Sequence, residues 1–221
     1  MALGRLSALQ ERLLVVLAGL DPAWTLSGGA ALVGFHTRHR ETRDLDLFWQ
    51  GRRDLGNASD DARARLEDAG LEVAVLQTGE TFCRLDVRAG ADSVVVDLVA
   101  DPGPLAEKPR LVTVQGAAFL VDTPHQILVN KLCALLSRSE VRDLVDVKAL
   151  LEAGGDLRRA LLDAPAQDGG FSPLTLAWST RGLPLRRLAA ALKMAPDAVL
   201  ELDRFREELV ERVLAEAKPP E

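Results

Sequence analysis

The sequence contains no tyrosine, two cysteines and three histidines among its 221 residues. Cys83 and Cys133 lie far apart, and no set of cysteines and histidines has the spacing of a zinc site. The chain also lacks a Walker A phosphate loop, a Gly-x-Ser-x-Gly nucleophile turn and a recognisable Cys–His pairing. These absences argue against a zinc module, a P-loop ATPase and the common serine or cysteine hydrolases.

No stretch reaches transmembrane length without charged residues, and the N-terminal segment has no apolar signal region. Together with two unpaired cysteines, this predicts a cytoplasmic protein with no membrane partner. The formal net charge is −6, which argues against a globally basic nucleic-acid binder but leaves a local basic face open. Hydrophobic residues make up 48% of the chain, enough for a sizeable core.

The hydrophobic periodicity predicts an α+β protein, with a mixed sheet and flanking helices followed by a helical C-terminal lobe. We expect one domain over residues 1–123 and the helical lobe over residues 124–221, because alternation gives way to helical spacing near Pro124. Predicted strands cover residues 24–26, 43–49, 71–77, 82–88, 93–99, 111–114 and 118–121. Predicted helices cover residues 3–20, 30–37, 57–69, 124–137, 141–153, 157–162, 183–193 and 196–217, with a loop over 165–173.

A pair of glycines, Gly28 and Gly29, follows the first predicted strand and precedes a helix. Glycine permits positive φ and close backbone approach, and N–H groups at a helix N-terminus can hold phosphate. A tight strand-to-helix turn explains the glycines equally well when they are considered alone. Ser27 contributes either a hydroxyl to such a site or a cap to the helix.

Two aspartates, Asp44 and Asp46, occupy alternate positions of the second predicted strand. Residues i and i+2 of a strand project from one face, so the two carboxylates lie close together. Their apolar neighbours, among them Leu45 and Leu47, imply burial that is costly for like charges without compensation. A hard cation such as Mg²⁺ provides it, and we therefore favour metal binding over a solvated surface strand.

A third aspartate, Asp97, interrupts an apolar run of valine and leucine. It either pairs with one of the many arginines, turns toward solvent at a strand end, or acts in the site. We favour a functional role, as a third carboxylate or as the base that activates an attacking hydroxyl.

Charged residues also occur inside two apolar helices of the C-terminal lobe. Their spacing predicts contacts across a helix pair, either as a structural ion-pair network or, for Lys131, as a contact to a triphosphate. These residues are Lys131, Arg138, Arg142, Asp143 and Asp146.

These motifs together resemble the nucleotidyltransferase superfamily, and more closely its AbiEii/AbiGii toxin group. The resemblance rests on Gly28-Gly29-x-x-Leu32, on Arg40-x-Thr42-x-Asp44-x-Asp46, and on two later segments. Those segments are Lys131-x-x-Ala134-Leu135-x-x-Arg138 and Arg142-Asp143-x-x-Asp146. The resemblance covers roughly residues 26–151.

The resemblance implies a core like that of DNA polymerase β, with NTP as substrate. In such a core, Ser27, Gly28 and Gly29 hold the triphosphate, and Asp44, Asp46 and Asp97 bind two Mg²⁺ ions. Lys131 matches a position that touches nucleotide phosphates, and Asp143 matches a late acidic motif. Arg40, Thr42, Arg138, Arg142 and Asp146 would support these groups.

We therefore expect a Mg²⁺-dependent transfer of NMP from NTP to an acceptor, with RNA and tRNA in particular favoured, by the toxin of a toxin–antitoxin or abortive-infection pair. A cognate antitoxin is then an expected partner. One alternative is transfer to a small molecule or a protein hydroxyl. Another is a nucleotide- or partner-binding protein without catalysis.

Overall fold

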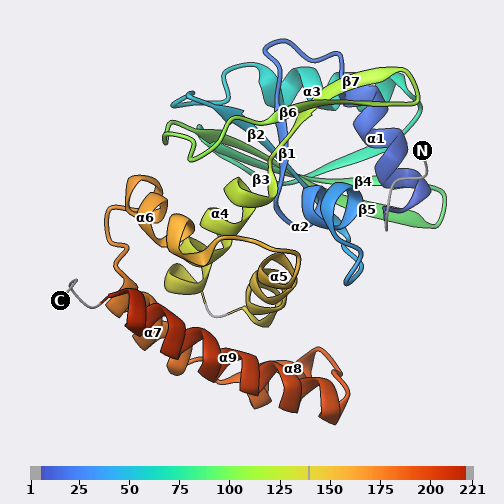
Figure 1. Ribbon diagram of the computed structural model, residues 1–221. Coiled ribbons are helices and arrows are strands. Elements are labelled where there is room, and N and C mark those ends of the chain that lie inside the picture. The colour runs from blue at the N-terminus through green and yellow to red at the C-terminus, as the bar shows by residue number, and fades with distance from the viewer. Residues whose placement is uncertain (1–5, 139, 218–221) are drawn as a thin grey trace. The chain divides into compact units, whose positions relative to one another are not determined.

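The structure, a computed structural model, describes residues 6–138 and 140–217. The chain forms two compact units, the first ending at Thr123 and the second beginning at Pro124 (Figure 1). The first unit contains α1 (Ala8–Leu17), β1 (Thr25–Ser27), α2 (Gly28–Ala31), a π-helical turn η1 (Leu32–His36), β2 (Asp44–Gln50), α3 (Ala58–Asp68), β3 (Glu72–Thr78), β4 (Phe82–Ala89), β5 (Asp92–Asp101), β6 (Arg110–Val114) and β7 (Ala117–Val121).

The seven strands described in the first unit form one sheet in the order β3-β4-β5-β2-β1-β7-β6. Strands β2 and β5 are parallel, as are β1 and β7, whereas the remaining neighbours are antiparallel. The sheet is therefore mixed, as expected, and it contains the strands predicted at residues 24–26, 43–49 and 93–99. The α+β fold class expected from the sequence is confirmed as well.

The central strands show one buried face and one polar face. On β2 the odd positions Leu45, Leu47 and Trp49 are buried, while Asp44 and Asp46 are only half-buried. Helices α1 and α3 contact each other and the sheet, and α1 reaches β5. This core explains the alternation, because the apolar side chains of one face pack under helices and leave the acids on the other.

The second unit is helical. It contains α4 (Pro124–Ser137), α5 (Val141–Glu152), α6 (Leu157–Gln167), α7 (Pro173–Arg181), α8 (Leu185–Ala191) and α9 (Pro196–Glu216). Helix α4 contacts α5, α6 and α7, and α7 packs along α9. None of the helices within the described ranges has the length and apolar character needed to cross a lipid bilayer.

The first two expected helices differ from the sequence prediction at their ends. Helix α1 begins after Ser7, whose side chain and that of Gln10 form a reciprocal capping box, and it stops at Leu17. The expected start at residue 3 lies outside the described residues. The helix expected from residue 30 begins at Gly28 and continues into η1, because the glycine turn enters the helix without an intervening loop.

Two further differences lie in the second unit. Helix α6 passes Pro165 and ends at Gln167, so the loop expected over residues 165–173 is shorter. Pro165 has no N–H to donate to the helix, but it lies in the last turn, and the helix continues past it to Gln167. Helix α7 was not expected, although Ser172 caps it together with Thr175 and Pro173 occupies its first turn.

Candidate active site

A row of polar residues crosses four strands on the polar face of the sheet. Ser27 at the end of β1 is paired with Asp46 of β2, Asp46 with Asp97 of β5, and Asp97 with Arg84 of β4. Paired residues on neighbouring strands share a face, so these four side chains lie in one line. Asp44 projects from the same face two residues before Asp46. The structure thus brings the three predicted carboxylates onto one surface.

Gly28 provides the close approach at the end of this row. It has φ +61°, and a Cβ atom built there would lie 2.1 Å from Asp46 Oδ2. Only glycine can hold the backbone against this carboxylate without moving it. The glycine turn therefore packs directly against the aspartate strand. The sequence motif contains both segments but does not show this contact.

Gly29 is surrounded by two other predicted residues. A Cβ at this position would lie 2.7 Å from Arg40 Nη2 and 3.1 Å from Thr42 Oγ1. Arg40 and Thr42 therefore lie directly against the turn at Gly29. Ser27 is buried and makes no capping hydrogen bond to the helix that follows, so its expected alternative role as a cap is wrong.

Replacing Gly28 with alanine should test this contact. We expect the Asp46 carboxylate to be displaced, with transfer falling at least about tenfold and stability by roughly 1–3 kcal/mol. The matched control is Gly90→Ala, because Gly90 has φ +62° but no atom within 4 Å of a built Cβ. That control loses stability through backbone strain alone and keeps its activity. Equal effects of the two changes on transfer would show that the contact to Asp46 is irrelevant.

Arg84 is the residue of this row that sequence reasoning did not identify. Its Nε and Nη2 donate to the two oxygens of Asp97 at 2.7 and 2.6 Å. The hydrogen bonds to Asp97 raise the pKa of Arg84, and the charges of Asp97, Asp44 and Asp46 raise it further. The sequence of the β4–β5 hairpin could have predicted this pair. Its two-residue turn begins with Gly90, and such a turn sets the register in which Arg84 lies opposite Asp97.

The donor set of this face fits a hard divalent cation. Asp44, Asp46 and Asp97 share the surface, and the Arg84 guanidinium already interacts with all of them, whereas Asp86 on the same face is paired with Arg88. That guanidinium marks the place where positive charge is favourable, and carboxylate oxygens are the ligands that Mg²⁺ takes. In the present conformation, the described residues contain no cluster of three acidic, histidine or cysteine side chains arranged around a common metal position. Both carboxylate oxygens of Asp97 accept hydrogen bonds from Arg84.

A fourth carboxyl group, Asp122, lies beside Ser27 and was not anticipated. It follows β7, its N–H donates to the Leu26 carbonyl at 2.9 Å, and its side chain is fully buried. Neither carboxyl oxygen accepts a hydrogen bond of regular geometry from the described residues. Burial raises the pKa of Asp122 to about 6, the nearby Ser27 hydroxyl lowers it in part, and Asp101 raises it further.

Asp122 should make stability depend on pH. The folded state holds the Asp122 proton more tightly than the unfolded chain does. The cost of burying a charged carboxylate is therefore absent below about pH 4, where the group is neutral in both states. This cost lowers the free energy of unfolding progressively up to about pH 6 and in full above it. At about pH 8, Asp122→Asn should raise the free energy of unfolding by on the order of 2 kcal/mol, with little effect near pH 4. Asp86→Asn is the control, since Asp86 is paired with Arg88 at 2.7 Å. Urea titrations at both pH values decide, and a pH-independent effect would contradict the assignment.

The predicted helical residues form a separate buried cluster inside the second unit. Lys131 Nζ of α4 lies 2.7 Å from Asp143 Oδ1 and 2.8 Å from Asp146 Oδ2 of α5. Arg138 donates to both oxygens of Asp143, while Arg142 is exposed on α5. The expected contacts across a helix pair are confirmed. Burial lowers the pKa of Lys131, but the charges of Asp146 and Asp143 outweigh it, so the net pKa is raised and the ammonium stays charged.

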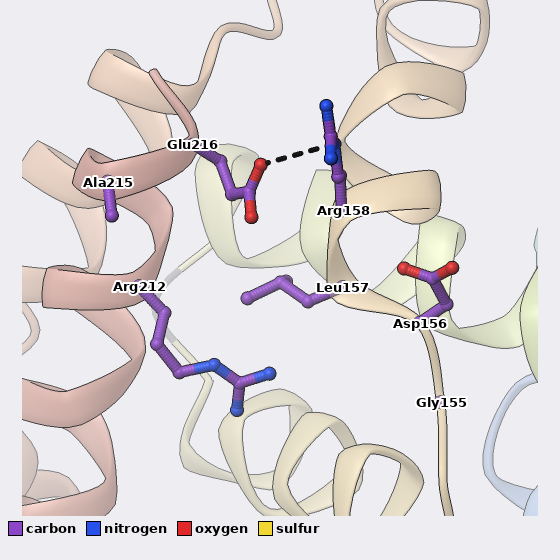
Figure 2. Close-up of a pocket in the computed structure, with 7 residues that line it drawn as sticks. All are labelled: Gly155, Asp156, Leu157, Arg158, Arg212, Ala215 and Glu216. Atoms are coloured by element: carbon purple, nitrogen blue, oxygen red, sulfur yellow. Dashed lines mark ion pairs between the residues drawn. The ribbon is translucent and has the colours of Figure 1, made fainter. Parts of the chain in front are cut away.

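An open hollow of about 320 Å³ lies between the start of α6 and the end of α9. Figure 2 shows Arg158 directed at Glu216, with Nε 3.5 Å from Oε2, and Arg212 extending toward Leu157. None of the residues predicted from the sequence lines this hollow. Asp156 caps α6 by accepting from the Arg159 N–H at 3.0 Å. Arg158 and Glu216 thus pair with each other, and Asp156 serves as a helix cap.

The fold is similar to that of several solved structures, among them proteins described as nucleotidyltransferases. A putative nucleotidyltransferase from Helicobacter pylori is 19% identical with a TM-score of 0.57, over 95% of this chain and 98% of that one. MenT4, a nucleotidyltransferase toxin from Mycobacterium tuberculosis, is 18% identical with a TM-score of 0.53, over 96% and 91%. ANT(2'')-Ia in complex with adenylyl-2''-tobramycin is 14% identical with a TM-score of 0.53, over 73% and 99%. At these identities the likeness establishes the fold.

The family described as "Nucleotidyl transferase AbiEii toxin, Type IV TA system" matches residues 12–217. The chain therefore belongs to the AbiEii family and is a nucleotidyltransferase. A comparison with curated proteins finds no match.

Proposed function

We propose that this enzyme transfers a nucleoside monophosphate from NTP to an RNA acceptor, with tRNA favoured, in a reaction that depends on Mg²⁺. The observation that carries the proposal is the row of Ser27, Asp46 and Asp97, with Gly28 against the Asp46 carboxylate. This arrangement places a tight backbone turn beside carboxylates on the polar face of the sheet. A triphosphate needs a backbone turn that can hold it, and its metal ions need carboxylates.

Each residue of the row then has a role. Asp44 and Asp46 would hold Mg²⁺, and Asp97 would join them after Arg84 turns away; two ions are expected. Bound Mg²⁺ would neutralise charge on the phosphates. The Gly28–Gly29 turn would hold the triphosphate, with Ser27 beneath it. The acceptor hydroxyl oxygen forms a bond to the α-phosphorus, the bond to pyrophosphate breaks, and a carboxylate such as Asp97 takes the hydroxyl proton.

Family membership supports a toxin with a cognate antitoxin as partner and a cytoplasmic location. A second candidate, transfer to a small-molecule hydroxyl, is favoured by the similarity to ANT(2'')-Ia, a protein solved with an adenylylated aminoglycoside. A nucleotide-binding protein without transfer would not need three carboxylates on one face.

One assay separates these candidates. The full chain is incubated with each labelled NTP in turn, with total RNA, an aminoglycoside, or no acceptor, in Mg²⁺ or in EDTA. We expect label in RNA only with Mg²⁺. Label in the aminoglycoside would favour the second candidate, and label in the protein itself would point to a protein hydroxyl as acceptor. No transfer with any NTP would overturn the proposal.

A further inference from the structure

A segment of the second unit differs sharply in charge from the rest of the chain. Residues 169–196 contain no aspartate or glutamate but four basic residues, whereas the chain as a whole carries a net charge of −6. The four are Arg181, Arg186, Arg187 and Lys193, and all are exposed. Within the described part of the chain, none of them forms an ion pair. This stretch of α7 and α8 is therefore a local region of uncompensated positive charge.

The same segment carries the most exposed tryptophan of the protein. Trp178 on α7 is 82% exposed and Leu174, one turn earlier, is 62% exposed, whereas Trp24 and Trp49 are 2% and 1% exposed. Residues i and i+3 lie on the same helix face, so Arg181 flanks the indole of Trp178. An exposed indole beside unpaired arginines is typical of surfaces that stack bases and hold phosphates.

The surface is held rigid by contacts of its backbone. Ser172 and Thr175 close a capping box at the start of α7. Arg206 of α9 donates to the carbonyls of Arg181 and Leu183 at 3.0 and 3.3 Å, which fixes the turn between α7 and α8. Two acids of α9, Asp203 and Glu207, are both paired with Arg206. Neither forms an ion pair with the described arginines of α7 and α8.

We propose that the exposed side chains of α7, α8 and the turn after α8 form a docking surface for single-stranded RNA. They are Leu174, Trp178, Arg181, Arg186, Arg187 and Lys193. The unpaired cations complement phosphates, and the indole offers a stacking platform for one base. An acidic protein would use the charges but gains less from a flat, isolated ring. The inference rests on the proposed function in taking the bound strand as acceptor RNA.

Binding can be measured on the full chain without NTP or Mg²⁺. A single-stranded RNA of about 12 nucleotides falls within known site sizes for unstructured strands. Because Trp24 and Trp49 are buried, quenching of intrinsic fluorescence by this RNA reports on Trp178. We expect saturable quenching, and an affinity that falls with salt by a slope of about −0.7 per phosphate contacted.

Charge-matched variants test the surface itself. Arg181→Ala/Arg186→Ala/Arg187→Ala should weaken RNA binding at least about tenfold and flatten the salt dependence. The control is Arg158→Ala/Arg204→Ala/Arg212→Ala, which removes the same charge from exposed positions of α6 and α9 and should change affinity less than about twofold. Trp178→Ala should weaken binding by roughly tenfold, and Trp178→Phe by less. Fluorescence anisotropy of labelled RNA measures the variants that lack the indole.

Equal affinities of the two triple variants would overturn the proposal. So would polyglutamate of similar length competing as well as RNA does, which would indicate an acidic protein partner. The outcome is separate from that of the transfer assay. If the protein binds RNA specifically but transfers no nucleotide, the docking surface is supported and the proposed enzymatic function is contradicted. If the surface variants transfer nucleotide to RNA as well as the wild type does, only the docking surface is contradicted.

Discussion

Replacing Asp46 with asparagine should abolish nucleotidyl transfer while leaving the protein folded. The carboxylate is pressed against Gly28 and shares a face with Asp44 and Asp97, so a neutral amide at this position would lose a metal ligand. Metal stabilisation of developing charge is worth several kcal/mol, so we expect a loss of at least about a hundredfold. Asp44→Asn should behave in the same way. Initial rates of label transfer in saturating Mg²⁺ provide the measurement.

The matched control is Asp86→Asn. Asp86 lies on β4 on the same face of the sheet, in line with Val95 and Asp44, but it is neutralised by an ion pair with Arg88 and is not one of the predicted metal ligands. Its loss should leave transfer near the wild-type rate. Thermal unfolding of Asp46→Asn should show unchanged or raised stability, since one of several like charges has been removed. Wild-type turnover of Asp46→Asn would exclude this carboxylate from the metal site.

Replacing Lys131 with alanine should cause the largest loss of stability. The ammonium lies between Asp143 and Asp146, whose side chains are almost fully buried. Its removal takes a buried ammonium away from two buried carboxylates, of which Asp143 keeps the Arg138 guanidinium, and we expect the free energy of unfolding to fall by about 3–5 kcal/mol. Adding Asp146→Asn should recover part of that loss. Urea unfolding followed by circular dichroism measures both variants.

Lys148→Ala is a close control, because this lysine on α5 also pairs with two carboxylates, Glu152 at 2.7 Å and Glu201 at 2.8 Å. Those partners are exposed, so the expected loss is within about 1 kcal/mol. The comparison also tests whether Lys131 contacts nucleotide phosphates. If Lys131→Ala lowers NTP affinity while stability is unchanged, the nucleotide role is supported and the buried ion-pair interpretation fails.

The polar face of the sheet illustrates how far local patterns reach. The alternation of Leu45, Asp46 and Leu47 was enough to place the acids on one face, because side-chain direction in a strand depends only on sequence position. The Arg84–Asp97 pair was missed because it required the register of β4 against β5. That register is set by the turn at Gly90, and a turn of one more residue would have moved Arg84 to the other face.

The helices likewise show which features the local sequence predicts and which it does not. The spacing of Lys131, Arg138 and Asp143 predicted contact across a helix pair, since charges inside apolar helices must find partners. Helix α7 was missed although its capping residues are visible in the sequence, because its exposed face carries Leu174 and Trp178 and so lacks a clear apolar and polar division.

The sequence by itself determined the strand and helix pattern, the face occupied by Asp44 and Asp46, and the glycine turn that precedes them. These features depend on backbone periodicity and on the conformational freedom of single residues. Only the tertiary structure decided that Gly28 lies against Asp46, that Arg84 holds Asp97, and that Asp122 is buried without a regular hydrogen bond. Those facts depend on which strands become neighbours and in which register, and such long-range pairing leaves no mark in the local pattern of any one strand.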